Sequence, residues 1–150
     1  MSMWWSFHLR REAASVPLAR RLLLGTMETA GVDPDVSFDL SVALTEACAN
    51  AVEHGGGADC GNYRVTAYIV GDTCRIEVTD SGPGLREQPA PVCTAPAGAS
   101  AATAESGRGL CMIEALTDRV RYRSRSGRRG TTVSFDKALK WREGAPLAAL

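Results

Sequence analysis

The spacing of apolar residues along the chain predicts a fold of helices and strands. Apolar side chains recur every three or four residues after Ser15 and again after Asp33, as on the buried face of a helix. Elsewhere apolar and polar residues alternate, which is typical of strands. The predicted helices run from Ser15 to a stop at Gly31, from Pro34 to about His54 and from Leu110 to about Leu116, and the predicted strands are 3–11, 64–70, 74–79, 119–125 and 131–136.

Residues with special backbone preferences mark the helix ends. Ser15 is predicted as the N-cap of the first helix, with Pro17 in the first turn, where a missing N–H breaks no hydrogen bond. Gly31 is predicted to end that helix. Asp33 and Pro34 form a second start signal, with Asp33 as the N-cap and Pro34 at the first helical position.

Residues 85–106 differ from the rest of the chain, with three prolines, many alanines and no periodicity. A linker here would leave about 44 residues beyond it, too few for a separate core, so a lid is the better interpretation. With the lid, the order of elements is β-α-α-β-β-lid-α-β-β. This order predicts an α+β two-layer sandwich, a mixed, mostly antiparallel sheet with helices on one face.

Composition narrows the possible classes of function. The 17 basic and 17 acidic side chains give no net charge, which argues against direct nucleic-acid or membrane binding. No apolar run approaches the length of a membrane span, and the first ten residues do not resemble a signal peptide. Five cysteines without a C-x-x-C pair favour reduced thiols over disulfides or a zinc site. We therefore expect a cytoplasmic protein.

Three short motifs contain side chains or glycines suited to ligand binding. Glu46 and Asn50 lie four residues apart on the second helix, with His54 four further on, so the three share one stripe. The segment 80–84, Asp-Ser-Gly-Pro-Gly, follows a strand, where glycines let backbone approach a ligand. The segment 106–110, Ser-Gly-Arg-Gly-Leu, opens a predicted helix, whose free N–H groups would suit phosphate. Taken alone, each also fits a solvated helix flank, a plain turn or a hinge.

The order and spacing of these motifs, with Gly130-Thr131 on the last strand, resemble the GHKL ATPase superfamily, which shares the Bergerat nucleotide-binding fold. Within it, the segment from Leu44 to His54 looks like the bacterial anti-sigma-factor serine/threonine kinases. The resemblance covers residues 5–137. It implies a single ATP-binding domain over residues 1–150, with an ATP lid at 85–106 and a tail at 138–150. The segment from Trp141 to Leu150 falls outside the resemblance, and for it a frayed helix and a dimer contact both stay open.

The resemblance also implies roles for particular residues. Asn50 would hold Mg²⁺ bound to ATP, and Glu46 would orient or deprotonate the attacking hydroxyl. Asp80 would accept a hydrogen bond from adenine, supported by Thr131. Arg108 would neutralise charge on the departing phosphoryl group. The remaining expected nucleotide contacts are Gly82 and Gly84 beside the base and Gly107, Gly109 and Leu110 beside the phosphates.

The implied function is that of an anti-sigma regulatory factor that binds ATP and Mg²⁺. Such a protein phosphorylates a serine or threonine of an anti-anti-sigma protein with a STAS-type domain, and it sequesters a sigma factor. A homodimer is expected from the family. Two alternatives stay open: an ATP-sensing binding module without phosphotransfer, and an interaction protein that binds no nucleotide.

The predicted strand at 119–125 has arginine at every second position, namely Arg119, Arg121, Arg123 and Arg125, so all four share one face. In a sheet covered by helices on one side, this is the open face. These arginines could pair with acidic residues of neighbouring strands, such as Glu77 or Asp136. The alternatives are a protein-docking surface or an oligomer contact, and nucleic-acid binding is the least favoured.

Overall fold

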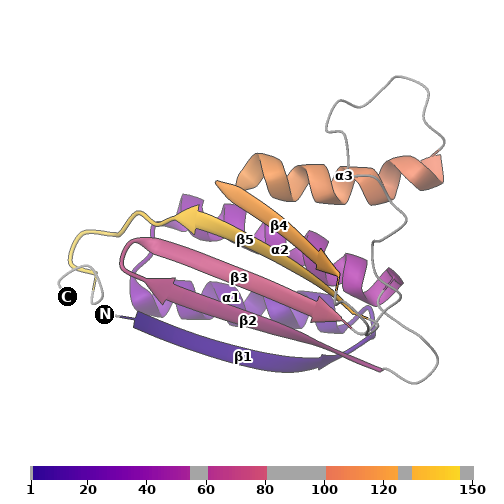
Figure 1. Cartoon of the computed structure of the whole chain (residues 1–150). Coiled ribbons are helices and arrows are strands. Elements are labelled where there is room, and N and C mark those ends of the chain that lie inside the picture. The colour runs from indigo at the N-terminus through magenta and orange to yellow at the C-terminus, as the bar shows by residue number, and fades with distance from the viewer. Residues whose placement is uncertain (1, 55–60, 81–100, 125–129, 146–150) are drawn as a thin grey trace.

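The computed structural model in Figure 1 describes residues 2–54, 61–80, 101–124 and 130–145, with backbone only at 54, 101–108 and 124. Three helices and five strands lie within these ranges. In chain order they are β1 (Ser2–Arg10), α1 (Ser15–Ala30), α2 (Pro34–His54), β2 (Asn62–Val70), β3 (Thr73–Asp80), α3 (Ala101–Leu116), β4 (Arg119–Ser124) and β5 (Thr131–Ala138).

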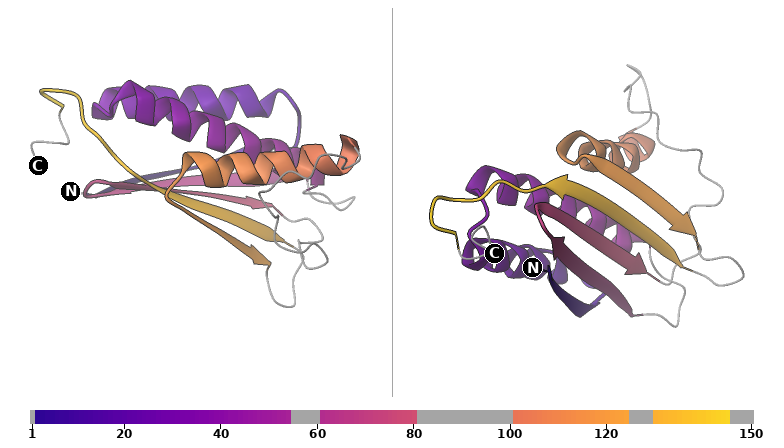
Figure 2. Two further views of the ribbon diagram at one scale, coloured as in Figure 1. Left: turned by 90° about the horizontal axis from the view of Figure 1, so that it is seen from above. Right: turned by 60° about the vertical axis from the view of Figure 1, so that its left-hand side comes forward.

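The strands form one sheet in the order β1-β2-β3-β5-β4. Its four strand pairings are all antiparallel, so the expected parallel component of the sheet is absent from the described residues. All three helices lie on one side of the sheet (Figure 2). The two-layer α+β sandwich predicted from the sequence is therefore confirmed.

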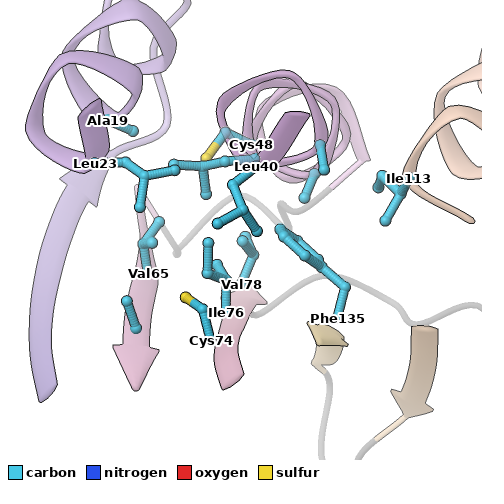
Figure 3. Close-up of a cluster of buried hydrophobic side chains, with 14 of the residues drawn as sticks. Ala19, Leu23, Leu40, Cys48, Val65, Cys74, Ile76, Val78, Ile113 and Phe135 are labelled. Carbon is cyan, nitrogen blue, oxygen red and sulfur yellow. The ribbon is translucent and has the colours of Figure 1, made fainter. Parts of the chain in front are cut away.

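The core lies between the sheet and the helices (Figure 3). Alternation places the apolar residues of β2 and β3 on the helix side, and the predicted core positions Val65, Ala67, Ile69, Ile76 and Val78 are all at most 2% exposed. Helix α2 contributes Leu40, Leu44, Ala47 and Cys48 to the same core, and α1 contributes Leu23 and Met27. Burial of this apolar surface is the main force that holds α2 against the sheet.

The predicted helix-end signals at Gly31, Asp33 and Pro34 are confirmed, and the one at Ser15 is wrong. Gly31 has φ 90°, a left-handed conformation suited to glycine, and ends α1. Asp33 caps α2, since its Oδ1 accepts the Asp35 N–H at 2.9 Å. Ser15 is the first residue of α1 and not its N-cap. Its hydroxyl donates to the Glu12 carbonyl oxygen at 2.7 Å and lies 2.6 Å from the Tyr63 hydroxyl, so it is used in the core.

Helix α3 begins nine residues before the predicted start at Leu110, at Ala101. Residues 101–106, which the sequence assigned to the lid, are helical. The reason is helix propensity, because four of these six residues are Ala or Glu, which are strong helix formers. Residues 85–100 of the predicted lid lie outside the described residues.

The chain after β5 packs against the body of the protein. Trp141 forms a β-bridge with Val32, and its indole N–H donates to Asp72 Oδ1 at 2.8 Å. Arg142 donates to the Glu28 carbonyl oxygen at 2.6 Å, and Leu139 and Ala145 are buried. The frayed helix is therefore wrong for residues 141–145, and the dimer contact stays a prediction. Among the described helices, none is long and apolar enough to cross a membrane.

Candidate nucleotide-binding site

Helix α2 carries Glu46 and Asn50, the two polar residues that the sequence analysis predicted to share one stripe. Both are half-buried, and they lie one turn apart. Helix α3 approaches this stripe at Gly109. A Cβ placed on Gly109 would lie 3.0 Å from Glu46 Oε2 and 3.7 Å from Asn50 Oδ1. Contacts of 3.0 Å are tighter than ordinary packing allows, so only glycine permits this approach of α3 to α2 without displacing Glu46.

A second pair of predicted residues meets across the sheet. Asp80 ends β3 and Thr131 begins β5, and the two are directly opposite in the antiparallel register. Each lies two residues along its strand from a valine, Val78 on β3 and Val133 on β5, so it points to the same side of the sheet as that valine. Both valines are buried under the helices. Thr131 is 6% exposed and Asp80 is half-buried. The pair therefore lies on the helix-covered face, on the same side of the sheet as α2.

The segments that carry the α2 stripe and the Asp80–Thr131 pair run toward the same end of the molecule. Figures 1 and 2 place the C-terminal part of α2, the end of β3, the start of β5 and the N-terminal part of α3 there. Segments that are far apart in sequence thus bring a carboxylate and a carboxamide on α2 and a strand-end carboxylate to the same region. Gly82 and Gly84, the expected base-binding glycines, lie outside the described residues.

The expectation that Gly107 and Gly109 open a helix is wrong. Because α3 begins at Ala101, both glycines lie in its interior. The free N–H groups of a helix belong to its first four residues, so these two glycines are beyond the segment that could offer N–H groups to phosphate in this conformation. Leu110 is 8% exposed and belongs to the hydrophobic core. Of Arg108, the backbone alone is described, within α3.

The oxygen atoms on α2 are of the kind that Mg²⁺ prefers. The Asn50 carboxamide and the Glu46 carboxylate supply hard oxygen donors, and Gly109 leaves the space beside them free of a side chain. Among the described residues, no group of three or more His, Cys, Asp or Glu side chains could hold a metal alone. A magnesium ion that keeps its waters and the nucleotide phosphates as ligands needs only one or two protein ligands, so the residues present fit it.

One supporting contact was not predicted from the sequence. Lys137 lies on the core side of β5, where the alternation of Val133 and Phe135 favours an apolar residue. Its ammonium donates to the Leu116 carbonyl oxygen at 2.6 Å and lies 3.4 Å from Asp39 Oδ2. It thereby joins the C-terminal end of α3 to α2. The sequence signal that could have indicated this contact is a lysine at a position where the alternation predicts an apolar residue.

Comparison with known proteins agrees with this fold. The family model described as the histidine kinase-like ATPase domain matches residues 9–137. The serine-protein kinase RsbW of Bacillus licheniformis is 34% identical over 128 residues, covering 83% of this chain and 78% of that protein. The serine-protein kinase RsbW of Bacillus subtilis is 31% identical over 129 residues, with the same coverage.

Solved structures share the fold. The RsbU and RsbW domains of Rv1364c from Mycobacterium tuberculosis match with a TM-score of 0.68 and 24% identity, over 93% of this chain and 32% of that longer one. The catalytic domain of the histidine kinase ThkA matches with a TM-score of 0.56 and 14% identity, over 93% of this chain and 99% of that one.

The fold is that of an ATP-using GHKL-type domain. The chain belongs to the histidine kinase-like ATPase family, together with the serine-protein kinases RsbW. As a member of this group it is a protein serine/threonine kinase. The resemblance found in the sequence is thus confirmed.

Proposed function

We propose that the protein phosphorylates a serine or threonine of a STAS-type anti-anti-sigma protein and sequesters a sigma factor when that antagonist is phosphorylated. The observation that carries the proposal is the convergence of Glu46 and Asn50 on Gly109. The RsbW relatives, named serine-protein kinases, support the choice of a protein hydroxyl as acceptor. The proposal places the protein in the cytoplasm as a homodimer.

Each proposed role is the one that the family resemblance implies, and it is supported by the chemistry of the residue concerned. The Asn50 carboxamide oxygen would hold Mg²⁺, and the bound ion would neutralise phosphate charge. The Glu46 carboxylate, one turn away, orients the acceptor hydroxyl and takes its proton. Asp80 accepts a hydrogen bond from the adenine amino group, and the buried Thr131 opposite it supports that edge. Arg108 neutralises charge on the departing phosphoryl group, the role that the resemblance implies for it. Gly82 and Gly84 complete the base pocket.

Calorimetry with ATP and Mg²⁺, followed by phosphorylation of candidate STAS proteins, tests these roles. We expect Asn50→Ala to abolish Mg²⁺-dependent ATP binding, and Asp80→Asn to weaken ATP binding with or without Mg²⁺. Glu46→Gln should retain ATP affinity and lower phosphotransfer by about 100-fold or more. Glu28→Gln, at an exposed position on α1, is the matched control and should change neither quantity.

The pattern of results separates the alternatives. Unchanged phosphotransfer in Glu46→Gln would refute the role of this carboxylate. ATP binding without phosphorylation of any STAS protein, with regulation unaffected in Glu46→Gln, would favour the ATP-sensing module. Absence of ATP binding in the unaltered protein would contradict all of the nucleotide roles.

A further inference from the structure

The face of the sheet opposite the helices carries a second set of functional side chains. Because side chains alternate along a strand, every residue whose neighbours are buried under the helices points to this open face. None of the described helices covers it (Figure 2). The open face is defined here by Trp4 on β1, Arg64, Tyr68 and Val70 on β2, Arg75 and Glu77 on β3, Asp136 on β5, and Arg119, Arg121 and Arg123 on β4.

The three arginines of β4 carry positive charge that is not neutralised within the described residues. In the register, Arg119 lies opposite Asp136, the nearest carboxylate across the strand pair. Asp136 is already bound by Arg75, which donates to its two carboxylate oxygens at 2.8 and 3.2 Å and whose own pKa is raised by that contact. No described carboxylate forms an ion pair with Arg119, Arg121 or Arg123. The pairing of β4 with Asp136 that the sequence allowed is therefore not formed.

The opposite half of the open face carries a cluster of Trp4, Tyr68 and Val70 beside polar residues such as Arg64. Trp4 is 68% exposed and Val70 is 64% exposed, and Trp4 lies directly opposite Tyr68 in the β1–β2 register. A hollow of about 390 Å³ adjoins them, lined by Tyr68, Val70, Thr73, Arg75 and Glu77. Large exposed apolar side chains beside a hollow are typical of a surface that another molecule covers.

We propose that the open face is a docking surface for a protein partner that presents an apolar segment flanked by acidic residues. The apolar segment would cover Trp4 and Tyr68, and the acidic residues would meet the β4 arginines. Trp, Tyr and Arg are the residues that carry most binding energy at protein interfaces, and opposite charge guides the encounter. The positive charge of β4 therefore selects an acidic partner, and the exposed aromatic residues select one that also presents apolar side chains.

Two other occupants fit the face less well. Glu77 and Asp136 lie on the same face and would oppose the phosphates of a nucleic acid, and the zero net charge of the chain supplies no general attraction for it. A second copy of the same face would bring the same excess of arginine with it, so like charges would be opposed.

The open face and the ATP site lie on opposite sides of the sheet, since Glu46, Asn50 and Gly109 belong to the helical layer. A partner on the open face therefore leaves the nucleotide site accessible. Its binding is expected to be independent of ATP, and this makes the proposal testable separately from the kinase function.

The test uses the full chain and a fluorescein-labelled peptide with glutamates on both sides of a central leucine-phenylalanine pair, followed by anisotropy. A peptide with glutamine in place of each glutamate and a single-stranded DNA of equal charge are the comparison probes. The variants are the double substitution Arg119→Gln with Arg121→Gln, and Trp4→Ser. Their matched controls, at exposed positions on helices, are Arg20→Gln with Arg21→Gln, and Phe38→Ser.

We expect the acidic peptide to bind the unaltered protein more weakly as salt is raised, and the glutamine peptide not to bind. Each open-face variant should weaken binding by about tenfold, with ATP affinity and thermal midpoint retained, and the controls should not weaken it. The proposal is overturned if the acidic peptide does not bind or if all variants bind it equally. Equal binding of DNA with the same arginine dependence would assign the face to nucleic acid. A dimer in light scattering that the open-face variants dissociate would assign it to a second copy.

Discussion

At the scale of single residues, the close approach of Gly109 to Glu46 is the feature that ties the fold to the chemistry. Replacement of Gly109 by alanine puts a Cβ at 3.0 Å from Glu46 Oε2. The carboxylate is the end of a flexible side chain, so it will move aside and the fold will persist. We expect Gly109→Ala to lower kcat by on the order of 100-fold, because misplacement of a catalytic group by about 1 Å costs that much. Phosphotransfer assays at saturating ATP measure this.

Gly25→Ala is the control for the effect of alanine on a helix. Gly25 lies inside α1, and a Cβ there meets no atom within 4 Å. This variant should gain about 0.5–1 kcal/mol in the free energy of unfolding and keep full activity. If Gly109→Ala is as active as Gly25→Ala, the contact with Glu46 has no catalytic consequence.

The positions of Glu46, Asn50, Asp80 and Thr131 could be predicted from sequence because regular elements fix them. A four-residue interval on a helix defines one stripe, and a residue at a strand end has a defined face. The contact of Gly109 with α2 could not be predicted, because it depends on how closely two helices pack. Such distances follow from the side chains at the interface and not from any local pattern.

At the scale of elements, α3 shows why the predicted start of this helix at Leu110 was wrong. Prolines and small residues made 85–106 look like an unbroken loop, and the alanines at its end were assigned with it. Alanine has the highest helix propensity, so residues 101–106 extend the helix that the tertiary contacts of Leu110 and Ile113 anchor. Ser15 failed for a related reason, since its hydroxyl contacts the buried Tyr63 instead of capping α1.

Lys137 should determine how firmly the C-terminal end of α3 is held. Its ammonium donates to the Leu116 carbonyl oxygen and pairs with Asp39, and it is only 16% exposed. Lys137→Met removes both contacts and leaves carbonyl groups of the helix end without this donor. We expect a loss of about 2 kcal/mol in the free energy of unfolding by urea, and faster hydrogen exchange of α3 amides.

Lys140→Met is the matched control, because Lys140 is exposed after the end of β5. Its effect should stay within about 0.5 kcal/mol. A loss in Lys137→Met no larger than that of Lys140→Met, or hydrogen exchange accelerated equally throughout the protein, would contradict a local anchoring role for Lys137.

At the scale of the whole molecule, the core joins distant segments and extends beyond the last strand. Trp141 and Arg142 connect the end of the described chain to the β2–β3 turn and to α1, through the Asp72 carboxylate and the Glu28 carbonyl oxygen. No periodic pattern marks this segment, so its packing against the body could not be predicted from the sequence. Its contacts form only after β5, α1 and the Gly71-Asp72 turn are in place, which is a property of the whole fold.

The same core predicts how stability depends on alkaline pH. Burial raises the pKa of the Cys48 thiol on α2 and of the Cys74 thiol on β3 from 9.0 to about 12. Between these values an unfolded thiol loses its proton while the folded one keeps it, so the folded state binds more protons and stability falls as pH rises. The slope should approach about 1.4 kcal/mol per pH unit for each thiol. Urea unfolding between pH 9 and 10, below the ordinary tyrosine pKa of 10.0, measures this slope.

Two substitutions test whether the thiols cause it. Cys48→Ala and Cys74→Ala should each remove about half of the slope. Val65→Ala, a buried truncation without a titrating group, should lower stability and keep the slope. A slope that survives both cysteine substitutions would show that other groups control alkaline unfolding.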